Sequence, residues 1–265
     1  MSALDLVLIG AGGFAAGAVN AMAGGGTFFS FPALLAVGLP PVVANASNSV
    51  ALWPGSLTGA WAYRRELAGY KRYLLPMGVA SLLGGVAGGL LLLAAGDARF
   101  SALIPWLLAF ATLLFAFSPQ LSTVLKRLRT PADTPADTPT QGAHGAGSVY
   151  GWGVQLLVSV YGGFFGAGMG ILMMASLAIG GHEDVQHINA LKNLMSAVIY
   201  SVTVMTFIIA GAVSWPHTLV MLLTASLGGY WGARIARNIQ GPWLRRLVIA
   251  VGSALTLYYF YKTQG

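Results

Sequence analysis

The chain has 265 residues, of which 56% are hydrophobic and only 8% are charged. Soluble domains carry about 25% charged residues, so this composition excludes a water-soluble globule and predicts a polytopic membrane protein that has the lipid bilayer as a partner. The absence of cysteine excludes disulfides, thiolate nucleophiles and thiolate metal sites. The net charge of +7 comes mostly from short clusters and not from one long basic run, which argues against nucleic acid as a partner.

The N-terminal stretch 1–26 has an apolar core, but Asp5 is its only charged side chain. A signal peptide has a basic region at its start. We therefore expect the stretch to be retained, although residues 20–23 resemble a cleavage site.

Apolar blocks of membrane-spanning length follow one another along the chain. They cover residues 4–37, 43–63, 73–95, 99–117, 148–180, 186–211, 216–237 and 243–261. The first block in each half is too long for one straight helix, because about 34 residues extend ~51 Å. We expect these two blocks to break at their glycines, Gly24–Gly26 and Gly162–Gly170, where the backbone can leave helical geometry without a steric penalty.

A polar segment, residues 118–147, separates two membrane repeats, 1–117 and 148–265. The tandem repeat Pro-Ala-Asp-Thr-Pro-Ala-Asp-Thr-Pro within it has little to bury, so we expect a flexible linker. The cations Lys126, Arg127 and Arg129 predict that this linker is cytoplasmic.

The two halves resemble each other when the sequence is shifted by 144 residues. Asn45-Ala46 then meets Asn189-Ala190, and the glycine pattern at 83–88 meets the pattern at 227–232. Cations lie between the second and third blocks of the first half and between the third and fourth blocks of the second half: Arg64, Arg65, Lys71 and Arg72, then Arg234, Arg237, Arg245 and Arg246.

If both cation clusters are cytoplasmic, the repeats are inserted upside down relative to each other. Each long first block must then return to the side it came from. The sequence thus predicts an all-α polytopic membrane protein with two pseudo-symmetric, inverted repeats, each a glycine-broken, re-entrant helix pair plus three transmembrane helices. A parallel duplication with weak charge control is the alternative.

Two patterns that resemble enzyme sites have simpler interpretations. The apolar run before Gly10–Gly13 resembles a dinucleotide-binding turn, but no acidic residue between Asp5 and Glu66 is available to hold a ribose. Close helix packing explains these glycines. His182 and His187 are five positions apart, which splays their rings by ~140° on a helix and does not suit a shared zinc ion. We therefore predict no metal, no cofactor and no enzyme activity.

The strongest constellation is a set of polar side chains at the start of the helix that follows each glycine break. Backbone N–H groups freed at glycines and helix N-termini provide an environment for an anion. Lys192 matches Asn48 in the shifted alignment and lies inside an apolar segment, where a lysine costs ~2.5–3.5 kcal/mol to insert. We predict that Lys192 faces a central cavity and meets an anionic substrate. Snorkelling of Lys192 to the membrane interface is the alternative.

The predicted substrate-binding residues comprise amides, one hydroxyl, one cation and the glycines that shape the site. They are Asn20, Gly24, Gly25, Gly26, Asn45, Asn48, Ser49, Gly168, Gly170, Asn189, Lys192 and Asn193. Trp53-Pro54 lies in the second block and serves either as a gating hinge or in packing.

Four motifs carry a family resemblance: Gly-Gly-Phe-Ala-Ala-Gly-x-x-Asn-x-x-Ala-Gly-Gly-Gly-Thr at 12–27, Pro-x-x-Ala-Asn-Ala-Ser-Asn-Ser at 41–49, the glycine-rich run 162–170, and Asn-Ala-x-Lys-Asn at 189–193. Together they resemble the TauE/SafE family of sulfite and organosulfur anion exporters, over nearly the whole chain outside the linker. The resemblance implies a bacterial inner-membrane permease for sulfite, sulfonates such as sulfoacetate, or related anions. The second half has Gly-Met-Gly at 168–170 in place of three glycines, so equal roles for the halves are not assumed.

We therefore expect a secondary transporter that exports a small sulfur-containing anion by alternating access through a midplane site. A passive anion channel, an uptake permease for a related organic anion, and a membrane-embedded enzyme or assembly factor are the alternatives. The apolar blocks have no carboxylate at mid-span, so coupling is expected to use His187, Lys192 or the membrane potential. A homo-oligomer is left open.

Overall fold

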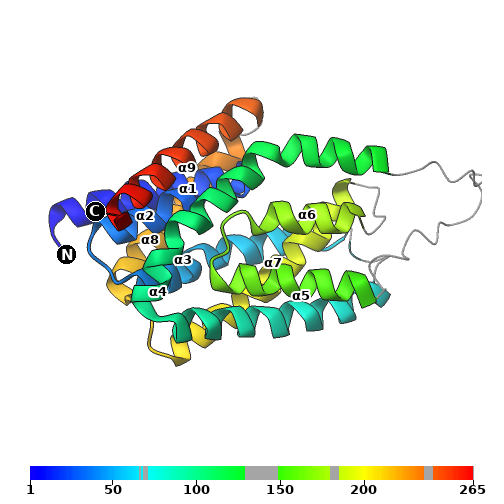
Figure 1. Cartoon of the computed structure of the whole chain (residues 1–265), viewed down its shortest axis with the longest axis horizontal. Helices are drawn as coiled ribbons and strands as arrows, with labels where there is room; N and C mark the ends of the chain where they lie inside the picture. The colour runs from blue at the N-terminus through cyan, green and yellow to red at the C-terminus, as the bar shows by residue number, and fades with distance from the viewer. Residues whose placement is uncertain (66, 68–70, 129–148, 180–184, 236–240, 265) are drawn as a thin grey trace, which may run out of the picture.

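The computed structural model describes residues 1–65, 67, 71–128, 149–179, 185–235 and 241–264. Over these ranges the chain forms helices and no strand, which confirms the all-α prediction. The helices are α1 (Ala3–Ala23), α2 (Thr27–Ala36), α3 (Pro41–Ala62), α4 (Lys71–Leu128), α5 (Val149–Phe164), α6 (Met169–Ile179), α7 (Val185–Ile209), α8 (Trp215–Ile235) and α9 (Gly241–Gln264). Figure 1 shows an elongated bundle with both chain termini at the same end.

The first apolar block of each half breaks at its glycines, as predicted. α1 ends before Gly24, which has a left-handed φ of 77° and so stops the helix. α5 ends before a turn in which Gly166 and Gly168 have φ values of 81° and 76°. The helices that follow, α2 and α6, have 10 and 11 residues. At ~1.5 Å per residue each covers about half of the hydrocarbon thickness.

α4 contains two predicted blocks in one element, divided by a kink. Gly96 has φ 68° and ψ 173°, which no helix accommodates, so the chain turns back between residues 95 and 97. The second part of α4 continues to Leu128. Residues 118–128 are therefore helical, although the sequence assigns them to the linker. Leucine, lysine and arginine in this stretch favour helix, and Pro131 lies just beyond it. The rest of the predicted linker, 129–147, falls outside the described residues.

The first helix of each half packs mainly against the other half. α1 makes its most extensive contacts with α8 of the other half, and α5 makes its most extensive contacts with α4. Glycines allow the backbones to touch: a Cβ at Gly17 would overlap the carbonyl of Ala225, and a Cβ at Gly88 would overlap the carbonyl of Val160. Small residues are the usual means of close helix approach in membranes.

The glycines that resemble a dinucleotide-binding turn have this same packing role. Gly12 and Gly13 lie within α1, where a Cβ at Gly12 would meet Ala33 and one at Gly13 would meet Met221 and Thr224. The glycines thus lie inside a packed helix and not in a turn after a strand.

Helices α3 and α7, which the shifted alignment pairs, run in opposite directions. Across the contact between α3 and α7, the indole Nε1 of Trp53 donates to Ser201 Oγ at 2.8 Å, and Gly59 lies beside Asn193. The later residue of α3 thus contacts the earlier residue of α7, so these two helices are antiparallel. In Figure 1, α1 and α5 likewise enter the bundle from opposite ends.

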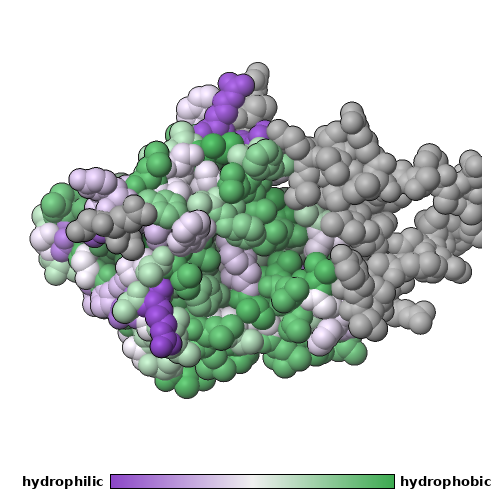
Figure 2. Space-filling view, in the orientation of Figure 1, coloured by the Kyte–Doolittle hydropathy of each residue, from purple (hydrophilic) through white to green (hydrophobic). Residues whose placement is uncertain are grey.

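By length and composition, three stretches of the described helices are apolar enough to cross a bilayer: Ala3–Ala21, Leu74–Ser118 and His187–Ile209. Large apolar side chains are exposed along the bundle, as Leu157 (71%) and Ile209 (83%) illustrate. Figure 2 shows hydrophobic residues over most of the described part of one face. Such an extended apolar surface suits contact with lipid tails. α3 is less apolar because it carries Asn45, Ser47 and Asn48, but these side chains are buried in protein.

Candidate functional site

The two helix interruptions lie against the same short stretch of α4. A Cβ added at Gly25 would lie 3.0 Å from the ring of Phe115. One added at Gly168 would lie 3.4 Å from Leu114 and 3.6 Å from Ala111. Because residues 111–115 make about one helical turn, the interruption of each repeat is held next to that of the other.

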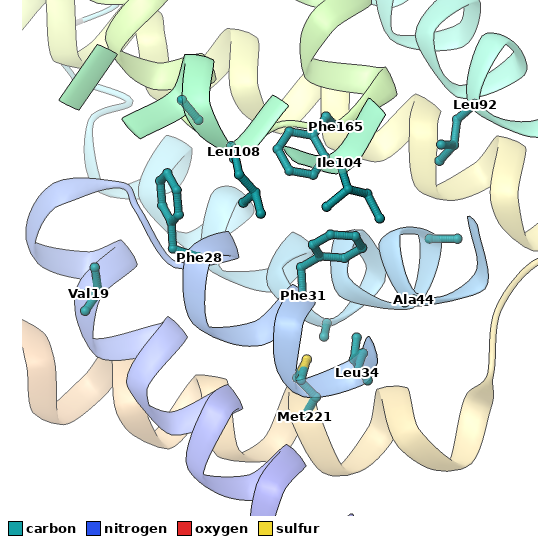
Figure 3. Packing of buried hydrophobic residues seen from close by; sticks show 14 of the residues in the cluster. Val19, Phe28, Phe31, Leu34, Ala44, Leu92, Ile104, Leu108, Phe165 and Met221 are labelled. Atoms are coloured by element: carbon teal, nitrogen blue, oxygen red, sulfur yellow. The ribbon is translucent and has the colours of Figure 1, made fainter. Parts of the chain in front are cut away.

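An aromatic cluster packs beside the interruptions and joins the repeats. The rings of Phe31 (α2) and Phe165 (just after α5) meet edge-on with centroids 5.6 Å apart. Phe100 of α4 packs against both Phe31 and Phe165, at 6.1 and 6.3 Å. Figure 3 shows Phe31 and Phe165 facing each other next to Ile104. These contacts fix where the break of the second repeat lies relative to α2.

In the first repeat, the predicted polar residues form a buried hydrogen-bonded set. Ser30 donates its hydroxyl to Asn48 Oδ1 and lies 3.2 Å from the carbonyl of Gly26, so it ties α3 to the start of α2. Asn45 donates through Nδ2 to the carbonyl of Phe164 at 3.0 Å, which links α3 to the end of α5. Ser49 donates to the Asn45 carbonyl. Asn45 and Asn48 are each 1% exposed.

Asn45 keeps one polar atom without a partner. Its Oδ1 is buried and accepts no hydrogen bond from the described residues. A buried amide oxygen that is not satisfied costs about 1–3 kcal/mol. Such an atom next to a helix interruption is a candidate acceptor for a bound water molecule or a substrate hydroxyl.

In the second repeat, Lys192 lies on α7 beside the first turn of α6. A Cβ at Gly170 would lie 3.6 Å from Lys192 Cδ, so the lysine methylenes pack where α6 begins. α6 and α7, over the ranges that the structure describes, contain no Asp or Glu. Asn193 faces α3, since a Cβ at Gly59 would lie 3.4 Å from its Oδ1. Asn189 is partly buried.

The polar sets of the two repeats lie on opposite sides of the α3 and α7 crossing. Asn48 precedes Trp53 by five residues, and Lys192 precedes Ser201 by nine. Because α3 and α7 are antiparallel, these steps lead in opposite directions. The Cα atoms of Asn48 and Lys192 are therefore roughly 20 Å apart along the helix direction, at ~1.5 Å per residue. Asn48 and Lys192 flank the meeting point of the interruptions from either side and do not form one cluster.

Asn20 and the predicted glycines shape the interruptions through the backbone. The carbonyl of Asn20 accepts from the Gly24 N–H at 3.2 Å, which terminates α1, while the Asn20 residue itself is exposed. A Cβ at Gly26 would overlap the carbonyl of Ala16. α2 begins without a side-chain cap, so its first turn relies on neighbouring groups to satisfy its N–H donors.

Two tyrosines near the interruption of the second repeat were not predicted from the sequence. The hydroxyl of Tyr200 on α7 lies beside the turn before α6, since a Cβ at Gly166 would lie 3.3 Å from it. Tyr161 of α5 donates its hydroxyl to the carbonyl of Ala167 at 2.5 Å, inside the turn before α6. The signal in the sequence is their position: both lie within apolar segments, whereas interfacial tyrosines lie at segment ends.

The pattern around His182 is outside the described residues from 180 to 184. His187 is described, near the start of α7. Among the described residues, no three His, Cys, Asp or Glu side chains come together as a metal site.

Comparison with known proteins assigns the family. Residues 9–259 match the model of the family described as "Sulfite exporter TauE/SafE". The chain is 26% identical over 256 residues to a "Probable membrane transporter protein" of Haemophilus influenzae, covering 94% of this chain and 92% of the relative. It is 27% identical over 249 residues to the "Probable membrane transporter protein ORF9" of Sinorhizobium sp, covering 92% and 88%.

The "Probable membrane transporter protein YfcA" of Escherichia coli K12 is 24% identical over 255 residues, covering 94% of this chain and 87% of the relative. No solved structure matches the chain. The matched family and these relatives are described as membrane transporters and not as enzymes, in agreement with the prediction from the sequence.

Proposed function

The chain belongs to the sulfite exporter TauE/SafE family, and we propose that this membrane transporter exports a small sulfur-containing anion, such as sulfite or a sulfonate, by alternating access. The proposed membrane is the bacterial inner membrane. The substrate would bind where the interruptions of the two repeats meet.

One observation carries the proposal: the helix breaks of both repeats are held against one turn of α4, at Phe115 and at Ala111 and Leu114. Interrupted helices expose backbone N–H groups at positive helix ends, which suit an anionic substrate. Lipid-exposed irregular backbone is costly, so such breaks persist where they line a binding site or are buried in protein.

The antiparallel arrangement of α3 and α7 supports an inverted repeat. A two-fold relation between parallel repeats would make these equivalent helices parallel, whereas the bond from Trp53 to Ser201 and the contact of Gly59 with Asn193 require the opposite. Inverted repeats related by an axis in the membrane plane are a common basis of alternating access.

The cations favour one end of the bundle as cytoplasmic. Arg64 and Arg65 follow α3, Arg234 lies in the last turn of α8, and Arg245 and Arg246 lie in the first turns of α9. The Ser214 N–H, just before α8, donates to Ser47 Oγ early in α3, and Leu52, later in α3, belongs to the same hydrophobic cluster as Ala225, later in α8. α3 and α8 therefore run in the same direction. These cations therefore share one end, which the positive-inside rule makes cytoplasmic.

With this orientation, Lys192 lies on the cytoplasmic side of the crossing and Asn48 on the outer side. A cation beside the first turn of α6 would attract an anion from the cytoplasm, and its aliphatic part is already held by packing on Gly170. The negative interior potential favours outward movement of an anion by ~2.3 kcal/mol per charge per 100 mV.

The transport test uses purified protein in liposomes loaded with sulfite or sulfoacetate. We expect saturable efflux and counterflow, and Lys192→Gln should lower the rate about 10-fold or more while membrane insertion is retained. Lys262→Gln is the matched control, because Lys262 is an exposed cation in the last turn of α9. Flux that does not saturate and lacks counterflow would make the protein a channel. Unchanged transport by the Lys192 variant would remove this residue from the mechanism.

A further inference from the structure

We propose that Asn45 Oδ1 accepts a hydrogen bond from the transported anion itself, so that the site selects anions that carry an O–H group over anions that have acceptors alone. The inference rests on the proposed function and narrows its substrate class to protonated oxyanions such as hydrogensulfite and to sulfonates that bear a hydroxyl. It concerns binding, and no proton leaves the ligand.

Asn45 is buried, and the orientation of its amide is fixed. The residue is 1% exposed, and its Nδ2 donates to the carbonyl of Phe164 at 3.0 Å. Because a carbonyl can only accept, turning the amide over would set Oδ1 against the Phe164 oxygen and lose this bond. Ser49, one helical turn later, gives its hydroxyl to the backbone carbonyl of Asn45. Oδ1 therefore needs a donor that the described residues do not provide.

The other buried side-chain atoms without a partner, in the part of the chain that the structure describes, can be satisfied by small rearrangements. If the amide of Gln155 turned over, Oε1 would face the hydroxyls of Ser81 and Ser159, which now lie 2.8 and 3.3 Å from Nε2 and are able to donate. Thr112 can turn its hydroxyl onto its own helix, as the equivalent threonine of α9 does. Asn45 has neither option, so its missing donor points to a ligand.

Asn45 lies where the first repeat touches the interruption of the second repeat. Phe164 is the last residue of α5, and Gly166, with a left-handed φ of 81°, lies in the turn that follows. Phe165 packs edge-on against Phe31 of α2, which holds this turn against the first repeat. An unpaired acceptor of one repeat thus lies beside the broken backbone of the other, which is the position that the proposed function gives to the substrate.

An acceptor at an anion site sets a requirement on the ligand. Backbone N–H groups at helix ends attract charged oxygens, whereas an amide oxygen such as Asn45 Oδ1 repels them. When the site closes around an anion without a donor, Oδ1 stays unpaired, as it is in the structure. An O–H group on the ligand removes this penalty, and a site that pairs a substrate hydroxyl discriminates strongly against the analogue that lacks it.

The test measures dissociation constants of the purified full-length protein by calorimetry, at a mildly acidic pH where sulfite carries one proton. It uses two matched pairs of singly charged anions: hydrogensulfite with methanesulfonate, and isethionate (2-hydroxyethanesulfonate) with ethanesulfonate. We expect the hydroxyl-bearing member to bind about 10-fold or more tightly in at least one pair. Preference in the first pair alone identifies a protonated oxyanion, and preference in the second pair identifies a hydroxyalkyl sulfonate.

Asn45→Leu keeps the approximate size of the side chain and removes the acceptor, so the preference within a pair should fall to about twofold or less. A purely structural role of the bond to Phe164 would weaken all four anions alike and leave each ratio as it was, and that result would contradict the inference. Gln155→Met is the matched control. It removes an equally buried amide nine residues before Phe164 on α5, and it should leave the ratios unchanged even if thermal stability falls.

The unmodified protein decides the question by itself if Asn45→Leu does not fold. Failure to bind any of the four anions would refute the proposed function together with the inference. Binding with equal affinity within both pairs would overturn the inference alone, and a water molecule would then be the partner of Asn45 Oδ1.

Discussion

Arg245 offers the sharpest test of how α4 is held beside the interruptions. Its Nε donates to the Phe115 carbonyl at 3.0 Å, and its Nη2 donates to the Ala116 carbonyl at 2.7 Å. Residue 119 is proline and has no N–H to give to the carbonyl of Phe115, four residues earlier in α4. The guanidinium therefore replaces a helical hydrogen bond that the sequence removes, in the turn that packs on Gly25.

The size of the effect follows from these bonds. Hydrogen bonds to a charged group contribute about 1.5–3 kcal/mol each, and Arg245 makes two. The Ser118 hydroxyl also donates to the Phe115 carbonyl at 3.0 Å, which keeps that acceptor partly satisfied and lowers the sum. We expect Arg245→Met to destabilise the protein by about 2–4 kcal/mol. For a chain of this length that is a fall in melting temperature of roughly 5–15 °C.

The assay is thermal unfolding in detergent, followed by intrinsic fluorescence. Arg246→Met is the control, because the neighbouring arginine is exposed and should change the melting temperature little. Pro119→Ala restores an N–H for the Phe115 carbonyl, so Arg245→Met should cost about half as much in that background. Equal melting temperatures for the two arginine variants, or an unchanged loss in the Pro119→Ala background, would refute the reasoning.

Two further predictions test the packing and the orientation. Gly163→Ala places a methyl group against the Gly85 backbone and should destabilise the protein by ~1–3 kcal/mol. Gly153→Ala, in the same helix with nothing within 4 Å, should be neutral or stabilise the protein by up to ~1 kcal/mol. Thermal unfolding compares the two variants, and similar shifts in melting temperature would contradict the packing of α5 on α4. Because the chain has no cysteine, the single variants Arg64→Cys and Lys262→Cys can be labelled in intact cells and in inverted vesicles. A membrane-impermeant thiol reagent should reach residue 64 from the cytoplasmic side and residue 262 from the outside. Labelling of both residues from the same side would exclude the proposed orientation.

The helix breaks could be predicted from the sequence because their cause is local. Three successive glycines end α1, and a glycine-rich run ends α5, at positions where φ is positive. The end of α4 could not be predicted as well, because residues 118–128 are polar enough to suggest a linker yet consist largely of helix-forming residues.

The arrangement of the predicted site residues in space could not be read from the repeat alignment. The shifted alignment pairs Asn48 with Lys192, but α3 and α7 are antiparallel, so these two residues lie on opposite sides of the point where the helices cross. Residues at the level of Trp53 and Ser201, where α3 and α7 meet, lie close to the opposite repeat. Tyr200 lies there and has no aromatic counterpart, so a search for matched residues passes over it.

The exchange of first helices between the halves has a consequence for assembly. α1 is made first, yet its main partner, α8, is made nearly last. During synthesis the glycine face of α1 therefore stays without its protein partner until α8 has been inserted. Neither half alone contains both helices of the α1 and α8 contact. If the chain is divided between α4 and α5 and the two fragments are expressed separately, each fragment should be degraded. When both are expressed together, they should assemble and both should accumulate, as the subunits of an obligate heterodimer do.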